Sequence, residues 1–297
     1  AVLVVLAEVG LRAGQRRDVA DLHGDGRLGR RRGAVLVRAL QPFPHLLVGK
    51  RNPGVGQVGQ VVAGIGELLW DLLPTGKQMG GAPANFAFHA AQCGCESHII
   101  SAVGDDADGS ELLDRIEKQN LNPSLIQKNR YPTGTVTVSL SQQGQPDYTI
   151  HEGVAWDNIA FDTALKNIAG KLNAVCFGSL AQRNPVSATT VQRLLSATNP
   201  DCLKVFDINL RQSYYSKEII ETSLQSTDIL KLNNDELPVL SAFLKLSGES
   251  EGQLNQLLIR YNLKFVVYTL GAKGSIVLSR TAISRLDAPK IEVTDTV

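Results

Sequence analysis

Short apolar runs alternate with amphipathic stretches along most of this chain. "VVAGIGELLWD" (residues 61–71) is typical of a buried strand that runs into a glycine turn, and similar strands are predicted at 97–104, 173–180, 202–208, 227–233 and 264–270. Between them, helices are predicted near 80–94, 108–120, 185–197, 216–224, 234–243 and 251–261. Short buried strands that alternate with helices predict an α/β fold, a mostly parallel sheet with helices on both faces.

One stretch departs from this alternation. "TVTVSLSQQGQPDYTIHEG" (residues 135–153) alternates polar and apolar residues on both sides of Gln143–Gly144, a pattern that predicts a β-hairpin or part of a small sheet. Parallel sheets bind ligands at the edge formed by the carboxyl ends of their strands. We therefore expect residues from about 130 to 156 to form a β-rich lid over that edge.

The first 60 residues differ in composition from the rest. They contain ten basic and four acidic residues, a net charge of +6, and no Ser, Thr, Ile, Tyr, Trp or Cys, whereas residues 61–297 carry a net charge of −5. A basic tail that binds polyanions is one interpretation, and a targeting peptide is a second, although transit peptides are rich in Ser and poor in acids. A third is sequence foreign to the fold, such as a wrong-frame stretch. We expect residues 1–60 to be a poorly ordered Arg- and Gly-rich extension and 61–297 to form the domain.

The chain as a whole gives few global signals. Its 297 residues carry a net charge of +1, which indicates neither nucleic acid nor an acidic membrane as a partner. No apolar run approaches the roughly 18 residues of a membrane span. Of the four cysteines only Cys93 and Cys95 are close in sequence, and we expect lone buried thiols in a reducing cytoplasm.

Two known nucleotide-binding motifs, the dinucleotide-binding G-x-G-x-x-G and the P-loop, can be tested against this sequence. Gly64 and Gly66 form a G-x-G, but the third glycine of a dinucleotide motif would fall at Leu69, and Pro74 follows where a helix is needed. The dinucleotide interpretation is therefore weak. No G-x-x-x-x-G-K-[ST] occurs in the chain, which excludes a P-loop.

Glycines and short polar residues follow six successive strands. Because the carboxyl ends of parallel strands share one edge, such residues together suit a hydroxylated ligand and an anion, although any one of them can be ordinary loop sequence. The set is Gly64, Gly66 and Asp71; Gly80, Gly81 and Asn85; Gly178 and Arg183; Asp207, Asn209 and Arg211; Asn233 and Glu236; and Thr269, Gly271 and Gly274.

The stretch "GGAPANFAFHAAQCGCESHIISAVG" (residues 80–104) resembles the first signature of the ribokinase (PfkB) family of carbohydrate kinases. "DINLR" (207–211), "NNDE" (233–236) and "TLGAKG" (269–274) resemble the later motifs of that family, in the right order. The resemblance covers residues 61–297, and the wording is most similar to bacterial fructokinases. It implies a ribokinase-like fold, a cytoplasmic enzyme, and family lids that often make homodimer contacts.

The activity implied by the resemblance is ATP-dependent phosphorylation of a hydroxyl of fructose or a related ketose. A 2-keto-3-deoxygluconate kinase is an alternative, since its family also shows D-x-N-x-R, and a nucleoside kinase is less favoured. A non-catalytic protein that binds a sugar or a nucleotide is an alternative of a different class.

The resemblance assigns the sugar to Asp71, Gly80, Gly81, Asn85, Trp156 and Arg183. A carboxylate accepts strong hydrogen bonds from sugar hydroxyls, glycines allow the sugar to approach the backbone, and an Asn amide both donates and accepts. Trp156 would cover the sugar as part of the lid, or would simply pack under it. Arg183 would steady the substrate or the transferred phosphoryl group, or would be a solvated loop cation.

For ATP and its phosphates, the resemblance implies Asn209, Arg211, Asn233, Thr269, Gly271 and Gly274. Glu236 would act on Mg²⁺ through water, because Mg²⁺ keeps much of its hydration shell in proteins. The spacing of Asn233 and Glu236 also predicts a capping box at a helix N-terminus. The turn at 269–274 would bind phosphate or ribose through backbone N–H groups.

The last residues, "IEVTDTV", resemble the start of the closing motif of the family, which continues with Gly-Ala-Gly-Asp. By this resemblance Asp295 would help to bind a monovalent cation such as K⁺. The final Asp of the motif is the general base and would lie beyond Val297. We therefore expect no catalytic base within these 297 residues, and essentially no activity from them alone.

Overall fold

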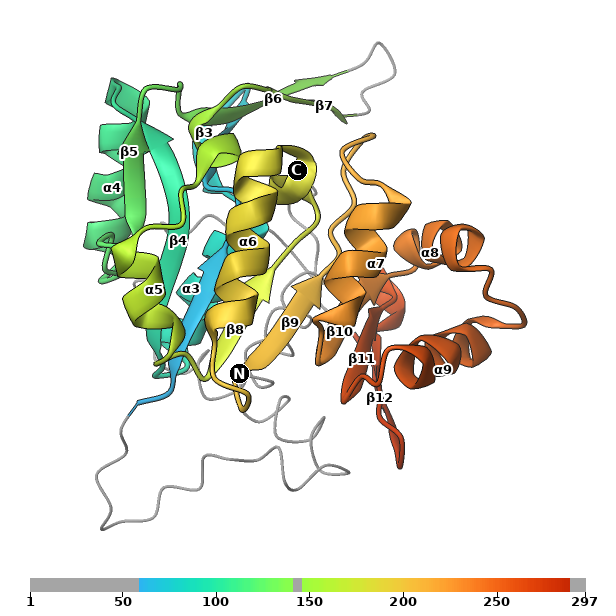
Figure 1. Cartoon of the computed structure of the whole chain (residues 1–297). Coiled ribbons are helices and arrows are strands. Elements are labelled where there is room, and N and C mark those ends of the chain that lie inside the picture. Colours follow the sequence, from blue (N-terminus) through green and yellow to red (C-terminus); the bar gives the residue numbers. More distant parts are fainter. Residues whose placement is uncertain (1–58, 141–145, 289–297) are drawn as a thin grey trace. The chain divides into compact units, whose positions relative to one another are not determined.

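The computed structural model describes residues 59–140 and 146–288 of the chain. The described chain divides into two compact units, Gly59–Ser226 and the residues from Thr227 onward (Figure 1). The predictions for residues 1–58, for the turn at Gln143–Gly144 and for Asp295 lie outside the described residues.

The larger unit is built on five parallel strands in the order β9-β8-β1-β4-β5. The strands are β1 (Val61–Ile65), β4 (Glu96–Gly104), β5 (Ile126–Asn129), β8 (Ala174–Phe177) and β9 (Leu203–Asp207). β4 is buried at every position after Glu96, and β8 is buried throughout. Such continuous burial is typical of a parallel sheet that is covered on both faces.

Five helices accompany this sheet: α3 (Ala82–Gln92), α4 (Ala107–Lys118), α5 (Thr163–Ala169), α6 (Pro185–Ala197) and α7 (Lys217–Gln225). In Figure 1, α6 lies in front of the sheet and α3 behind it, where α3 packs on β1 and β4. Local signals start the helices: Pro83 lies in the first turn of α3, and the Asp106 side chain accepts a 2.7 Å bond from the amide of Gly109 in α4. No helix in the described part of the chain is long and apolar enough to cross a membrane.

A second, smaller sheet has the strand order β3-β2-β6-β7. Its strands are β2 (Leu69–Leu73), β3 (Gly76–Gly80), β6 (Gly134–Leu140) and β7 (Pro146–Ile150). β6 and β7 pair antiparallel, which confirms the predicted hairpin. The sequence did not predict β2 and β3, because Pro74 and Gly76 suggested a loop, whereas only Pro74 and Thr75 form the connection and Gly76 begins β3.

The smaller unit contains β10 (Ile229–Asn233), β11 (Phe265–Thr269), β12 (Ser275–Leu278) and β13 (Ile283–Leu286). β10 and β11 are parallel and are joined through α8 (Glu236–Leu244) and α9 (Ser250–Arg260). β12 and β13 add antiparallel strands beside β11. The predicted α/β class, with a mostly parallel central sheet and a small additional sheet, is confirmed.

The cysteines only partly match their prediction. All four are free thiols, as expected, and Cys176 and Cys202 are buried in or beside the central strands. Cys93 is exposed, so the expectation that it is buried was wrong. The reason is its position at the C-cap of α3, where the helix leaves the core.

The first turn of α3 lies directly against β1. A Cβ atom at Gly64 would be 2.0 Å from the carbonyl oxygen of Pro83, far inside van der Waals contact. Ala84 and Ala87 of α3 join a buried apolar cluster on this side of the sheet that includes Ile99 of β4. The G-x-G after the first strand therefore serves the packing of a helix, and this explains why it does not continue as a dinucleotide motif.

Replacing Gly64 with Ala should destabilise the protein, because the added methyl group would overlap the backbone of Pro83. We expect the free energy of unfolding to fall by about 2 kcal/mol or more, as for an overpacked core. Gly170→Ala is the matched control, since Gly170 has φ −69° and no atom lies within 4 Å of the place that its added methyl group would take. Urea unfolding of both variants tests this, and equal stabilities would contradict the close approach.

Candidate active site

Two residues of the predicted sugar site, Asp71 and Gly80, meet between β2 and β3. Asp71 lies in β2, is only 9% exposed, and pairs in register with Gln78 of β3. A Cβ atom at Gly80 would lie 2.5 Å from Oδ2 of Asp71, so the carboxylate lies across the backbone of Gly80. Because Gly80 has no side chain, there is room beside it for the carboxylate of Asp71, the predicted acceptor for sugar hydroxyls.

Gly81 and Asn85 continue this site into the start of α3. Gly81 is the N-cap of the helix and has φ 121°, in the region that favours glycine. The amide of Asn85 donates a 2.9 Å bond to the carbonyl oxygen of Gly81, and its side chain is exposed on the first turn. The structure therefore places Asp71 against Gly80, with Gly81 and Asn85 in the N-cap and first turn of α3 directly after it, and the assignment of these residues to a sugar stays a prediction.

Glu67, in the turn between β1 and β2, is a site residue that sequence analysis missed. It is 2% exposed, and its Oε1 accepts bonds from the amide of Ala82 at 3.1 Å and from Nδ2 of Asn209 at 3.5 Å. Burial raises the pKa of its carboxyl above the ordinary value of 4.5; backbone hydrogen bonds and Arg211 oppose this rise, and Asp207 adds to it. The sequence signal that could have identified it is the position of Glu67 inside the otherwise apolar run "GIGELLW" (residues 64–70).

The residues after β9 are divided between buried and exposed positions. Asn209 is buried with φ 42°, a backbone conformation that is uncommon outside glycine, and it bonds to Glu67. Arg211 is exposed, and its Nη1 donates to the carbonyl oxygen of Leu210 at 3.0 Å. Asn209, which the resemblance assigned to the phosphates, thus contacts the turn between β1 and β2.

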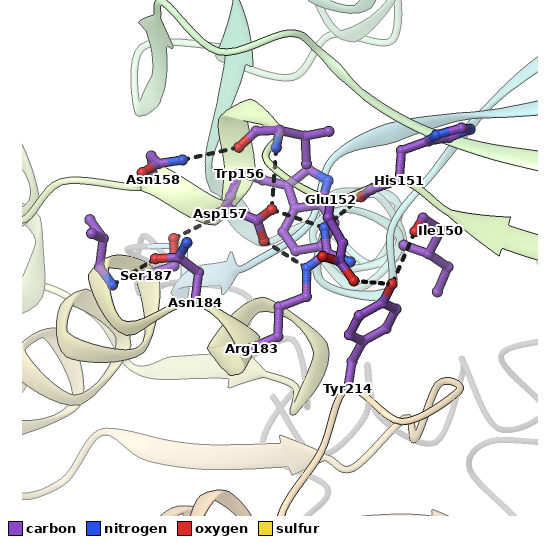
Figure 2. Close-up of polar contacts among 12 residues, drawn as sticks. Ile150, His151, Glu152, Trp156, Asp157, Asn158, Arg183, Asn184, Ser187 and Tyr214 are labelled. Carbon is purple, nitrogen blue, oxygen red and sulfur yellow. Dashed lines mark hydrogen bonds and ion pairs between the residues drawn. The ribbon is translucent and has the colours of Figure 1, made fainter.

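Arg183 is buried and ion-paired (Figure 2). Its Nε and Nη2 donate to Oδ1 and Oδ2 of Asp157 at 2.8 and 2.9 Å, and Nη2 also donates to the carbonyl oxygen of His151 at 2.6 Å. The side chains of Arg183 and Asp157 are 6% and 3% exposed. Nη1 is buried and has no hydrogen-bond partner within the described residues. The interpretation of Arg183 as a solvated loop cation was therefore wrong.

Trp156 lies beneath Arg183. Its side chain is fully buried in the 3₁₀ turn Ala155–Asn158, and the guanidinium carbon of Arg183 lies 4.1 Å from the centroid of its ring. Tyr214 contacts the same guanidinium at 4.6 Å and donates its hydroxyl to Oε1 of Glu152 at 2.7 Å. These contacts favour the packing interpretation for Trp156 and join the end of the small sheet to the segment after β9 (Figure 2).

In the smaller unit, Asn233 and Glu236 form the predicted capping box. Oδ1 of Asn233 accepts from the amide of Glu236 at 2.9 Å, and the amide of Asn233 donates to Oε2 of Glu236 at 2.8 Å. Glu236 is 4% exposed. Its carboxylate is therefore engaged in starting α8, and any effect on a cation is most simply exerted at a distance.

The turn after β11 is built on two glycines with positive φ. Gly271 has φ 55° and Gly274 has φ 90°, and Thr269 precedes them, only 9% exposed, at the end of the strand. The amides of Leu270, Lys273 and Gly274 all donate within the turn. The phosphate-binding prediction for this turn therefore depends on the amides of Gly271 and Ala272.

The donor set for a metal ion is sparse. Across residues 59–140 and 146–288, no group of three or more His, Cys, Asp and Glu side chains could hold a metal ion. An Mg²⁺ ion that keeps most of its waters would not need such a group. Glu236 remains the candidate for a contact through water.

Replacing Arg183 with Ala should lower the free energy of unfolding by about 3–5 kcal/mol, because Asp157 would keep a buried charge without its partner. Lys128→Ala is the control in the same unit. It removes an exposed pair, Lys128 Nζ to Asp105 Oδ1 at 3.7 Å, and should cost no more than about 1 kcal/mol. Urea unfolding compares the two variants, and a similarly small loss for both would show that the Arg183 pair is not buried in solution.

Several known proteins resemble this chain. A protein named as a sugar kinase from Pyrococcus horikoshii is 28% identical over 253 residues, which are 78% of this chain and 76% of the relative. An ATP-dependent 6-phosphofructokinase of Thermoanaerobacterium thermosaccharolyticum is 28% identical over 78% of this chain and 75% of its own length. A fructokinase of Salmonella typhimurium is 25% identical, with 78% of each chain covered.

The fold and the sequence agree on the family. A crystal structure of the P. horikoshii sugar kinase in complex with ATP matches 79% of each chain with a TM-score of 0.65 and 26% identity. The model of the pfkB family carbohydrate kinases matches residues 74–297, which is well over half of this chain. The chain therefore belongs to the pfkB family of carbohydrate kinases.

Proposed function

We propose that this protein phosphorylates a hydroxyl group of fructose or a related ketose with ATP as the donor. The observation that carries the proposal is the arrangement of Asp71 across Gly80, with Gly81 and the exposed Asn85 beside them. A carboxylate and an amide next to open backbone match several adjacent hydroxyls, which need both acceptors and donors.

The charge balance supports an uncharged sugar. Arg183 is the buried cation of the predicted sugar set, and its charge is matched by Asp157. A carboxylate or phosphate on the substrate would need an unmatched cation, because a buried charge without a partner is costly. The buried Nη1 of Arg183 would instead donate to a hydroxyl oxygen.

A phosphorylated or carboxylated sugar is the second candidate. One relative is named as a 6-phosphofructokinase, and the sequence also allowed a 2-keto-3-deoxygluconate kinase. Arg211 is exposed and is the cation in the predicted set that such a substrate would use. The two candidates therefore differ in whether Arg211 or Arg183 contacts the sugar.

ATP is the donor in this proposal, in line with the ATP complex of the P. horikoshii relative. Asn233, Thr269, Gly271 and Gly274 would bind the nucleotide, and Mg²⁺, reached by Glu236 through water, would neutralise the phosphate charge. We keep K⁺ as the expected monovalent cation, with Asp295 as its proposed contact.

An assay of ADP release over a panel of fructose, fructose 6-phosphate and 2-keto-3-deoxygluconate tests the proposal. It should be run with the 297-residue chain and with a chain continued by a family segment that begins Gly-Ala-Gly-Asp. We expect fructose to be turned over in preference to the two anionic sugars, because the charge of Arg183 is already matched by Asp157. Asp71→Asn in the continued chain should raise the KM for fructose by roughly 10- to 150-fold, the loss expected for a charged acceptor.

Two outcomes would contradict the proposal. A preference for either anionic substrate, lost in Arg211→Ala, would favour the second candidate. Binding of a sugar without turnover by either chain would indicate a non-catalytic sugar-binding protein.

A further inference from the structure

Glu67 is a buried acid to which neither the family resemblance nor the proposed reaction assigns a role. It lies in the turn from β1 to β2 and is 2% exposed. Burying a carboxyl group costs free energy in either protonation state unless its oxygens are bonded. One of its oxygens, Oε2, is buried with no hydrogen-bond partner among the residues that the structure describes. A side chain that only filled this space would not need a carboxyl group.

The bonded oxygen of Glu67 caps the helix that carries the sugar residues. The N-cap of α3 is Gly81, which offers no side chain to the free amides of the first turn. Oε1 of Glu67 accepts from the first of these amides, that of Ala82, at 3.1 Å. The cap is therefore supplied by a distant turn, and it joins that turn to the start of the helix.

The backbone of Glu67 constrains the same segment. A Cβ atom at Gly81 would lie 2.2 Å from the carbonyl oxygen of Glu67, so the two backbones are in direct contact. Gly66, one residue earlier, is itself held, because its amide donates to Ile100 at 3.0 Å and its carbonyl oxygen accepts from Ser101 at 2.6 Å. A turn anchored to β4 thus sets where α3 begins.

The third contact of Glu67 reaches the end of β9. Nδ2 of Asn209 lies 3.5 Å from Oε1 of Glu67, which makes a long hydrogen bond. The same oxygen also accepts from the amide of Ala82. Asn209 has φ 42°, and such a conformation persists when its surroundings impose it. The charged groups that act on Glu67 are Asp207 and Arg211, both from the same β9 segment.

We propose that Glu67 is a positioning residue for sugar binding. It holds the start of α3 and Asn209 in a fixed relation, and so aligns Gly80, Gly81 and Asn85 with the carboxylate of Asp71. The inference rests on the proposed function, because it concerns the same sugar site. It adds a residue that contacts no substrate and acts through the backbone of the residues that do.

Calorimetric titration of the 297-residue chain with fructose, and separately with ATP and Mg²⁺, tests this role. Glu67→Gln keeps an acceptor oxygen at the same reach, so its Kd for fructose should stay within about threefold of wild type. Glu67→Asp withdraws the acceptor by one methylene group and should weaken fructose binding about tenfold or more, as a small misplacement of a binding group does. The Kd for ATP should be unchanged in both variants.

Asp162→Ala is the matched control for a lost cap. Asp162 caps α5 through a 2.9 Å bond from the amide of Leu165 and lies outside the sugar set. It should lower stability and leave the Kd for fructose unchanged. If Glu67→Asp does not fold, Asn209→Ala decides the question from the other partner, and weaker fructose binding is expected.

The outcomes are distinct. Wild-type affinity for fructose in Glu67→Asp, or in Asn209→Ala if it has to stand in, would overturn the inference and leave the proposed function intact. Fructose binding by Glu67→Gln that is as weak as binding by Glu67→Asp would also overturn the inference, because the acceptor oxygen that Gln retains would not have preserved the affinity. A wild-type chain that binds no fructose would overturn the proposed function, and this inference with it.

Discussion

The candidate sugar site depends on how closely the start of α3 approaches the turn between β1 and β2. Gly64 and Gly81 are both points where a single methyl group would meet backbone, at 2.0 Å from Pro83 and 2.2 Å from Glu67. Close-packed interiors do not deform continuously, so such contacts fix the position of a helix more sharply than side-chain packing does. Because Gly80, Gly81 and Asn85 all follow from where α3 begins, these contacts also fix the site.

Charge within the larger unit is balanced by close partners. Arg183 is matched by Asp157 and stacked on Trp156, and burial favours the neutral form of Glu67. Such an environment offers hydrogen-bonding groups without a strong net field, which suits a ligand rich in hydroxyls. Neither Arg183 nor Asp157 would be stable as a buried ion without the other. The pair therefore holds together two segments that are separated in the sequence.

Much of the fold could be predicted because the signals for it are local. Unbroken apolar runs such as β8, and a helix with Pro83 in its first turn, can be recognised without knowledge of their neighbours. β2 and β3 could not be predicted in this way. Pro74 and Gly76 are loop-forming residues, and β2 pairs both with β3, which follows it directly, and with β6, over 60 residues away.

The same distinction applies to the site. Asp71, Gly80, Gly81 and Asn85 lie within one short stretch, so the sequence alone could single them out together. The partner of Arg183 lies 26 positions away and the partner Asn209 of Glu67 lies 142 positions away, so neither pairing left a local signal. For Trp156 the sequence left two interpretations open, a cover over the sugar or packing under the lid, because its burial under Arg183 arises only in the folded chain.

Hydrogen–deuterium exchange of the 297-residue chain with and without fructose tests the central claim most directly. If the sugar binds where α3 meets the β1–β2 turn, exchange should slow at residues 80–85, including the Ala82 amide that donates to Glu67, and should not change in α8. Saturation with fructose that leaves exchange at residues 80–85 unchanged would contradict the account.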